Sequence, residues 1–410
     1  MSPDTMTMRH QGATIQSGDP SNWRERQVVK RLDRLHTGRL EVRLPNGSTA
    51  IFAGEREGPS ARLIMHSPAM VTRLFKAGSI GFAEGYMAGE WDADDLAKLI
   101  YLLHLNEDAL EPDFSRLQHI YTLMSAIRHR LRRNSRRGSR RNIAYHYDLG
   151  NDFYAQWLDE TWTYSSAIFA DANEPLADAQ QRKYARLLER LNVKPGDHIL
   201  EIGCGWGGFA RYAAAHADCH VTGLTLSNEQ LRFARERAQA AGLSERLHFE
   251  LRDYRDVNTR YDHVVSIEMY EAVGEAYWPT YFAAIQAALK PGGKAAIQAI
   301  TIDDTRFDYY RANVDFIQEY VFPGGMLASP SVFCDQAERQ GLRVRETGFY
   351  GGDYARTLMR WDASVRAAAD TIITERGSAF YRMWRYYLAY CAAGFTSGNI
   401  DLMQIALQRD

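Results

Sequence analysis

The stretch ILEIGCGWGGFA, residues 199–210, decides the fold of this chain. A short apolar run is followed by four glycines within six positions: Gly203, Gly205, Gly207 and Gly208. Glycine takes positive φ values without steric cost, so this density predicts a sharp turn or a backbone that lies against a ligand. The residues after the glycines suit a helix. The stretch therefore predicts a buried strand, a glycine turn and a helix.

Strand-like and helix-like segments continue to alternate after this unit. The apolar runs that indicate strands occupy residues 219–226, 247–251, 263–269 and 294–302. Helical periodicity lies between them, and SNEQ at residues 227–230 is a capping box that opens one helix. Such alternation indicates an α/β fold with a mostly parallel, doubly wound sheet. Ligands bind such sheets at the carboxyl ends of the strands.

The composition is that of a globular protein. The chain has 410 residues, 45% of them hydrophobic and 24% charged, and a formal net charge of -2. This length favours two or three domains. No apolar run reaches the ~18 residues needed to span a bilayer, and the first 20 residues lack the apolar core of a signal peptide. The four cysteines show no paired spacing, which suits a reducing cytosol and predicts no metal site.

One concentrated basic band interrupts the chain. Residues 128–141, RHRLRRNSRRGSRR, hold eight arginines and no acid, and removing them takes the net charge from -2 to -10. Such a band is attracted to polyanions, for example an anionic membrane surface or a nucleic acid. The chain is expected to divide into a flexible tail (1–25), a small α+β domain (26–125) with a hairpin at 38–53, an Arg-rich linker (126–142) and the strand–helix domain (143–410).

The positions of the acidic residues indicate the ligand of the glycine turn. A dinucleotide site needs an acid at the end of the second strand, and residues 223–225 are Gly-Leu-Thr there. Glu201 instead stands two residues before the first glycine, where a carboxylate suits a ligand with an ammonium group and no phosphate. Asp253, just past the third strand, is placed to accept a hydrogen bond from an adenine amino group. These features favour S-adenosylmethionine over a dinucleotide.

Further polar and aromatic residues follow the same strand ends. Thr225, Ser227 and Gln230 offer hydrogen bonds to the ribose or the amino-acid tail. Trp206 and Tyr254 either offer aromatic faces to the cofactor or pack in the core. The binding residues derived in this way are Glu201, Gly203, Gly205, Gly207, Thr225, Leu226, Ser227, Gln230, Asp253 and Tyr254.

Several motifs together resemble the cyclopropane fatty acid synthase family, including mycolic acid cyclopropane synthase-like methyltransferases. They are YHYDLGNDFYAQWLDETWTYSSAIF (145–169), EIGCGWGG, TLSNEQ, EMYEAVG, FIQEYVFPGGMLASPS and YYLAYCAAGFTSGNIDLMQ. The resemblance runs from about residue 30 to the end of the chain. It implies a class I S-adenosylmethionine-dependent methyltransferase fold, with helical lid or acyl-binding insertions, behind a small N-terminal α+β domain that handles lipid.

The resemblance also implies an activity. Members of the family transfer a methylene carbon to the cis double bond of unsaturated phospholipid acyl chains, forming cyclopropane fatty acids through a carbocation and a late deprotonation. A bound bicarbonate is thought to accept the proton, and in the family it is held by a glutamate, a tyrosine, a histidine and backbone groups near a cysteine. The corresponding positions here are Glu271, Tyr354, Gln298, Ser166 and Ile300. The positions that match the family's catalytic residues are Glu271, Tyr354, Ile300 and Cys391, and those that match cofactor contacts are Tyr164 and Ser165. A cysteine in an apolar helix equally suits plain packing.

A location and an assembly follow from the same resemblance. Together with the basic band at 128–141, it implies a cytoplasmic enzyme that binds peripherally to anionic lipid on the inner face of the membrane. It also implies a homodimer.

Two positions depart from the family's pattern. Ser166 stands where many members have cysteine, and Gln298 stands where they have histidine. Glutamine cannot carry a proton as histidine does, although it can donate and accept hydrogen bonds to an anion. The product therefore stays open between a cyclopropane ring and a methyl- or methylene-branched chain.

Two alternatives come from other classes of protein. One is a lipid-binding protein without activity, against which the intact Glu201 and Glu271 argue. The other is a nucleic-acid methyltransferase, but the basic band lacks aromatic residues on which bases stack. No nucleic-acid partner is therefore expected.

Overall fold

The computed structural model describes residues 8–10, 13–16, 23–110 and 149–410. The basic band at 128–141 lies outside these residues. Contacts divide the chain into two compact units. The first comprises the described residues up to 127 with 313–316 and 365–397, and the second those of 128–312, 317–364 and 398–410.

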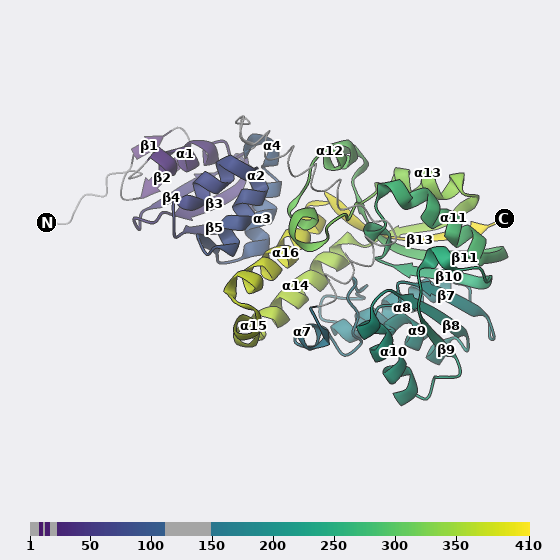
Figure 1. The fold of residues 1–410 in the computed structure, drawn as a ribbon. Coiled ribbons are helices and arrows are strands. Elements are labelled where there is room, and N and C mark those ends of the chain that lie inside the picture. The colour runs from purple at the N-terminus through teal and green to yellow at the C-terminus, as the bar shows by residue number, and fades with distance from the viewer. Residues whose placement is uncertain (1–7, 11–12, 17–22, 111–148) are drawn as a thin grey trace. The chain divides into compact units, whose positions relative to one another are not determined.

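The first unit is built on a six-stranded sheet, in the order β1-β2-β4-β3-β5-β6 (Figure 1). Its strands are β1 (Met8–His10), β2 (Ala13–Gln16), β3 (Thr37–Arg43), β4 (Thr49–Ala53), β5 (Arg56–Met65) and β6 (Trp91–Ala93). The predicted hairpin is confirmed, since β3 and β4 pair antiparallel with Leu40 opposite Phe52. β2 pairs antiparallel with β4 through its backbone.

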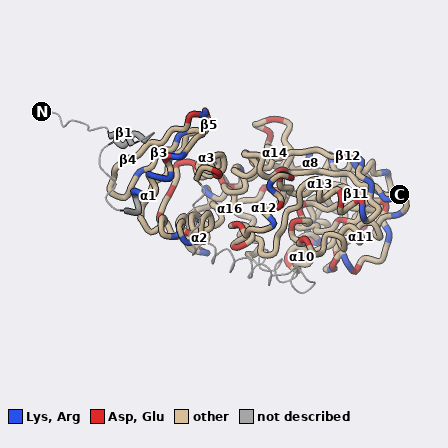
Figure 2. Tube along the Cα trace, turned by 90° about the horizontal axis from the view of Figure 1, so that it is seen from above, with Lys and Arg blue, Asp and Glu red and all other residues tan. Residues whose placement is uncertain are grey.

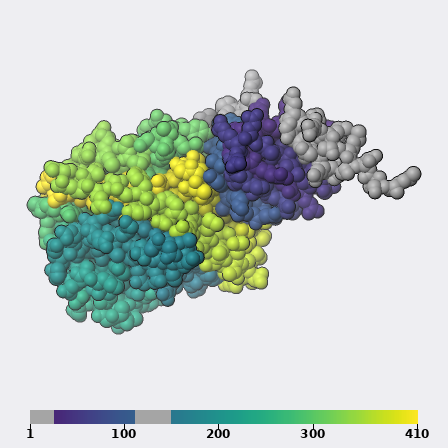
Figure 3. All heavy atoms as spheres, turned by 180° about the vertical axis from the view of Figure 1, so that it is seen from behind, coloured from purple at the N-terminus to yellow at the C-terminus, as the bar shows by residue number. Residues whose placement is uncertain are grey.

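The C-terminal helices α15 and α16 also belong to the first unit. Its helices are α1 (Trp23–Leu32), α2 (Ala69–Met87), α3 (Leu96–His104), α4 (Glu107–Leu110), α15 (Ala369–Arg376) and α16 (Ser378–Ser397). α16 packs on α2 and α3 (Figures 1 and 3). Arg382 of α16 donates to Asp92 over 2.9 Å, and its guanidinium lies 4.0 Å from the ring centre of Tyr86. The expected single domain over 143–410 therefore differs from the division by contacts.

The second unit is built on a seven-stranded sheet, in the order β12-β13-β11-β10-β7-β8-β9. Its strands are β7 (His198–Ile202), β8 (His220–Thr225), β9 (Leu247–Leu251), β10 (Tyr261–Ile267), β11 (Leu289–Ile302), β12 (Leu342–Phe349) and β13 (Ile400–Arg409). β7 to β11 are parallel, and β13 lies antiparallel between β11 and β12. The predicted mostly parallel α/β fold is confirmed.

Helices cover this sheet with two apolar clusters. The α-helices are α7 (Asn151–Ala155), α8 (Leu176–Leu191), α9 (Gly208–His216), α10 (Asn228–Ala240), α11 (Trp278–Ala288), α12 (Phe307–Ala312), α13 (Pro330–Arg339) and α14 (Gly351–Ala367). Short helical turns are η1 (Tyr254–Asp256), η2 (Tyr270–Ala272), η3 (Glu275–Tyr277), η4 (Asp304–Arg306) and η5 (Ile317–Val321). Leu187 of α8 and Ala213 of α9 belong to one cluster, and Phe282 and Ile285 of α11 belong to the other. The alanine side of α9 lets this helix approach the strands closely.

Charged residues of both signs are scattered over the described trace (Figure 2). Within that trace, no helix combines the length and the apolar composition that crossing a bilayer requires.

Candidate active site

A cavity of about 160 Å³ opens at the carboxyl ends of β7, β8 and β10. The chain leaves β7 for β8 on one side and later returns to β10 on the other, so this is the switch point at which parallel sheets bind ligands. Predicted cofactor residues that line the cavity are Tyr164, Ser165, Glu201, Gly203, Gly205, Thr225, Leu226, Gln230, Asp253 and Tyr254. The two others, Gly207 and Ser227, are the residues that precede α9 and α10.

The glycine turn presents bare backbone to this cavity. Gly203, Gly205 and Gly207 have φ values of 84°, 51° and 81°, which side chains rarely tolerate. A Cβ atom on Gly205 would meet nothing within 4 Å, whereas one on Gly203 would lie 3.0 Å from Cγ of Met269. Gly205 therefore faces open space, where a ligand can lie directly against the main chain.

Glu201 provides the acid at the floor of the cavity. It lies within β7, its exposed fraction is 2%, and its Oε2 atom has no hydrogen-bond partner among the described residues. Burial raises the pKa of this carboxyl well above its ordinary value, against the charge of Lys183. A buried acceptor without a donor is costly. The ammonium group of S-adenosylmethionine would supply an N–H donor and a positive charge to this oxygen, so the residues present fit this cofactor.

The opposite wall carries the remaining polar groups. The Thr225 hydroxyl donates to Oε1 of Gln230 over 2.9 Å, which fixes both side chains. Asp253 accepts two hydrogen bonds from the Arg255 side chain, at 2.8 and 2.6 Å. A carboxylate has lone pairs for further donors, so this ion pair orients Asp253 while leaving it able to accept from an adenine amino group. Trp206 donates to Asn151 over 2.8 Å and also lines the cavity.

A second carboxylate, the half-buried Glu268, lines the same cavity directly after β10. Its Oε1 accepts from the backbone N–H of Ser166 and from Nε2 of Gln298, both over 2.8 Å. Its Oε2 accepts from the Tyr354 hydroxyl over 2.5 Å. Three residues predicted to surround an added anion therefore converge on a side chain of the protein itself. The φ of Glu268 is 49°, a left-handed value that residues other than glycine seldom adopt.

Glu271 lies behind this carboxylate. Its Oε1 accepts from the backbone N–H of Ile300 over 2.5 Å, and its Oε2 has no partner among the described residues. Burial and the neighbouring charge of Glu268 raise the pKa of Glu271 to about 8. Glu271 is therefore mostly protonated at neutral pH.

A buried lysine stands near both cavity carboxylates. Lys183 of α8 is 0% exposed and donates to Oγ of Ser165 over 2.7 Å. Burial lowers its pKa to about 7, while the charges of Glu268, Asp159 and Glu201 act in the opposite direction. Lys183 is therefore about half protonated near pH 7, and its protonated form supplies positive charge to the cavity.

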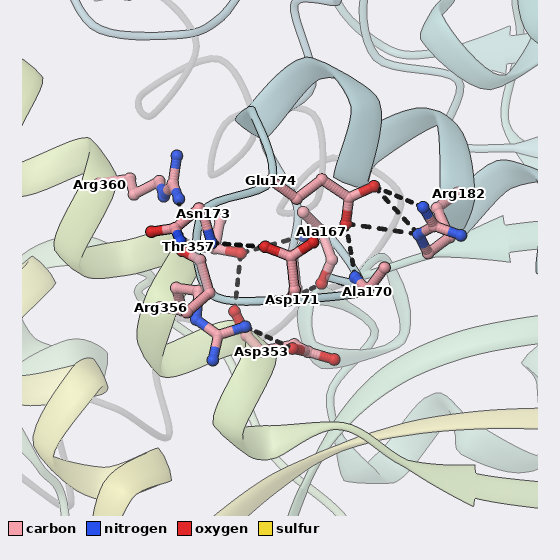
Figure 4. Close-up of polar contacts among 12 residues, drawn as sticks. Ala167, Ala170, Asp171, Asn173, Glu174, Arg182, Asp353, Arg356, Thr357 and Arg360 are labelled. Atoms are coloured by element: carbon pink, nitrogen blue, oxygen red, sulfur yellow. Dashed lines mark hydrogen bonds and ion pairs between the residues drawn. The ribbon is translucent and has the colours of Figure 1, made fainter.

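The loop that follows Ser166 is held by polar contacts to α8 and α14 (Figure 4). Ala167 donates its N–H to Oγ1 of Thr357 over 3.1 Å, and Glu174 receives Arg182 over 2.6 Å. Tyr354 and Thr357 stand three residues apart on α14, and both are buried. The same helix therefore anchors the Ser166 segment and presents the Tyr354 hydroxyl to Glu268.

The donors expected to hold bicarbonate are thus already bonded within the protein. Ser166, Gln298 and Tyr354 donate to Glu268, and Ile300 donates to Glu271. The second hydrogen of the Gln298 amide is also bonded, to the carbonyl of Ser166 over 3.3 Å, and its oxygen accepts from Gln404 over 2.9 Å. These residues do not fit an additional anion without breaking such bonds.

Cys391 is the one predicted catalytic residue outside the second unit. It lies on α16, and burial raises the pKa of its thiol. A half-buried thiol with a raised pKa is a poor nucleophile, in keeping with the packing role considered above. Sequence reasoning missed Glu268 and Lys183. The motif EMYEAVG contains two glutamates three positions apart, and only the second was given a role.

The seven-stranded sheet, the glycine turn and the acid of β7 define a class I S-adenosylmethionine-dependent methyltransferase. A family model described as mycolic acid cyclopropane synthetase matches residues 134–405. The chain belongs to this family of lipid-modifying methyltransferases.

Relatives cover most of the chain. The chain is 42% identical to the tuberculostearic acid methyltransferase UfaA1 of Mycobacterium tuberculosis, over 93% of this chain and 91% of that protein. It is 35% identical to the cyclopropane-fatty-acyl-phospholipid synthase of Escherichia coli, over 85% and 88%. The solved cyclopropane synthase MmaA2 of Mycobacterium tuberculosis matches with a TM-score of 0.63 and 29% identity, over 66% of this chain and 98% of that one.

A structure of mycolic acid cyclopropane synthase CmaA1 bound to S-adenosylhomocysteine and CTAB matches equally well, with a TM-score of 0.63. The predictions of the family, of the methyltransferase fold and of S-adenosylmethionine as the cofactor are confirmed.

Proposed function

We propose that this chain transfers a one-carbon group to the cis double bond of unsaturated acyl chains in membrane phospholipids, and that the product is a cyclopropane fatty acid. The observation that supports this is that one cavity is lined by two carboxylates, the buried Glu201 and the half-buried Glu268. Glu201 suits the ammonium tail of the cofactor, and Glu268 is a second carboxylate on the lining of the same cavity.

The proposed reaction needs no base for the methyl transfer, but it needs a site that shields a cation and a base that later accepts a proton. When bound, S-adenosylmethionine supplies an electrophilic methyl group on a sulfonium. The π electrons of the alkene form the new C–C bond while the C–S bond breaks, with its electron pair left on sulfur. The neighbouring acyl carbon becomes cationic, which requires a site that excludes water. Loss of a proton from the added carbon lets its C–H electron pair close the three-membered ring.

A branched product is the second candidate. A hydride shift along the acyl chain before the proton is lost leaves a methylene branch in place of the ring. Two observations favour it: Gln298 replaces the family's histidine, and a relative with 42% identity is named a tuberculostearic acid methyltransferase. Both candidates share every step up to the cation, and both remove the proton from the added carbon.

The basic band gives the proposed enzyme a route to its substrate. Eight arginines at 128–141 are attracted to anionic headgroups, at roughly 1 kcal/mol each near the surface. We propose peripheral binding to anionic lipid, and assembly as a homodimer.

Labelled lipids test the proposed function. A bacterial host without its own synthase expresses the chain and is fed methionine with a trideuterated methyl group, and its lipids are analysed by mass spectrometry. Each modified chain should gain one carbon that keeps two deuterium atoms. Resistance to catalytic hydrogenation then identifies a ring, whereas uptake of hydrogen identifies a methylene branch. Unmodified lipids would contradict the proposal, and three retained deuterium atoms would place the lost proton elsewhere.

A further inference from the structure

We propose that Glu268 is the proton acceptor of this enzyme, a carboxylate built into the chain that makes an added anion unnecessary. The inference rests on the proposed function, because only a cationic intermediate requires a late base. It goes beyond that function by naming the group that receives the proton.

The position of Glu268 is the first argument. The side chain lines the cofactor cavity, whereas Glu271 is bonded to the backbone of Ile300 behind it. The neighbouring residue Met269 reaches the glycine turn, since its Cγ lies 3.0 Å from where a Cβ of Gly203 would be. Glu268 thus lines the cavity beside the residue that packs on the glycine turn.

The hydrogen bonds of Glu268 are the second argument. Ser166, Gln298 and Tyr354 come from three separate parts of the second unit and all donate to this one carboxylate. Three donors hold its two oxygens in one orientation and favour its ionised form. Gln298 is itself fixed by Gln404, so the donor cannot turn away without further loss. The arrangement is that of a preorganised anion, which is what a base needs before it receives a proton.

The backbone of Glu268 is the third argument. Its φ of 49° lies in the left-handed region, where a residue other than glycine is strained. Such strain persists only where the surroundings enforce it, and it gathers at functional sites. The sequence keeps a glutamate at a position whose backbone would accept glycine more easily.

The division of charge between the two glutamates is the fourth argument. Burial raises the pKa of Glu268, but Lys183, Tyr354, Gln298 and the N–H of Ser166 all oppose this effect. Glu271 has only backbone donors against burial and the charge of Glu268, and its pKa is raised to about 8. Where two nearby carboxyls have such unequal surroundings, one holds the negative charge and the other the proton. The pKa of Glu268 is raised by burial on balance, but of the two carboxyls Glu268 is the one whose neighbours favour the charged form.

The step itself balances without any further reagent. An Oε atom of Glu268 takes a proton from the carbon that was added to the acyl chain. The electron pair of that C–H bond closes the ring onto the cationic carbon, or forms the double bond of a methylene branch. Glu268 becomes a neutral carboxylic acid and later returns its proton to water.

The first experiment compares isosteric variants. Glu268→Gln keeps the shape of the side chain, and its amide can donate to the Tyr354 hydroxyl, which then acts as an acceptor. We expect kcat to fall by about 10²- to 10⁴-fold, with S-adenosylmethionine affinity by calorimetry within about threefold of the wild type. Glu275→Gln is the matched control, because Glu275 pairs with Arg311 at the surface, and it should leave kcat unchanged.

The second experiment adds an anion from outside. Glu268→Gly removes the carboxylate and relieves the left-handed backbone, and it leaves the donors of Ser166, Gln298 and Tyr354 without their acceptor. Urea denaturation checks that the variant is folded before its turnover is measured. We expect added bicarbonate or formate to raise its turnover at least tenfold, while the wild type is indifferent to both.

Retention of at least one third of wild-type kcat by Glu268→Gln would overturn the inference. So would a wild type that stops working when bicarbonate is removed. If the wild type itself modifies no unsaturated phospholipid, the proposed function fails instead, and the two failures are therefore distinguishable.

Discussion

Replacing Glu271 by glutamine tests the division of charge at the site through stability. The ordinary pKa of this carboxyl is 4.5, and burial together with the charge of Glu268 raises it to about 8 in the folded protein. Between these values the folded protein holds a proton that the unfolded chain has released. Stability is therefore lost as pH rises through this window, by about 1.4 kcal/mol per pH unit for one group. From pH 5.5 to pH 7.5, this amounts to about 3 kcal/mol.

Glutamine cannot ionise, so Glu271→Gln removes this dependence. Its oxygen can still accept from Ile300, and the amide takes the place of the unpartnered Oε2. Titrations common to both proteins, such as that of Lys183, largely cancel in the comparison. The free energy of unfolding of the variant minus that of the wild type should therefore increase by about 3 kcal/mol between pH 5.5 and pH 7.5.

Urea denaturation followed by tryptophan fluorescence at several pH values measures this difference. Glu275→Gln serves as the control, because it changes an exposed carboxyl of the same segment, and its difference should stay flat. The same preparations report turnover, and Glu271→Gln should lose less than about tenfold in kcat. A stability difference that varies by less than about 0.5 kcal/mol over this range would mean that Glu271 is ionised like an exposed carboxyl. The reasoning that makes Glu268 the charged member would then be refuted.

Four further outcomes follow from the site. Glu201→Gln should weaken S-adenosylmethionine binding by about 2 kcal/mol, roughly 30-fold. Binding to the wild type should release protons, because the ammonium group of the ligand lowers the raised pKa of the Glu201 carboxyl. Equal binding heats in buffers of different ionisation enthalpy would contradict this release. Lys183→Met removes a charge that lowers the pKa of Glu268, so the acid limb of the kcat profile should move to higher pH, and an unmoved limb would exclude this coupling. Gly205→Val places a branched side chain at a φ of 51° in open space beside the cavity. Cofactor binding should be lost, and a normal affinity would mean that the cofactor does not lie against this turn. Binding of the protein to vesicles should require anionic lipid and weaken with salt. Salt-independent binding would exclude a role of the arginine band in membrane attachment.

The sequence predicts the scaffold well because each of its signals is local. The strand at 198–202, the helix start at Ser227 and the hairpin at 38–53 are each specified by neighbouring residues, and all three occur in the structure. The Ser227 hydroxyl accepts from the N–H of Gln230 as the capping box predicts, but the N–H of Ser227 donates to Thr225 and not to the Gln230 side chain. The placement of α15 and α16 with the first unit depends instead on contacts such as Arg382 with Asp92, which lie far apart along the chain. No local sequence pattern predicts the pairing of Arg382 with Asp92.

The site divides in the same way. Glu201 is predictable because its distance from the glycines is short and fixed, and its side chain follows from the strand. Glu268 is not, because its role depends on Ser166, Gln298 and Tyr354, which reach it from positions 102, 30 and 86 residues away. The resemblance to the family assigns those three residues to an external anion and gives Glu268 no role. Buried donors bond the nearest available acceptor. In this chain that acceptor is the side chain of Glu268 and not an external anion.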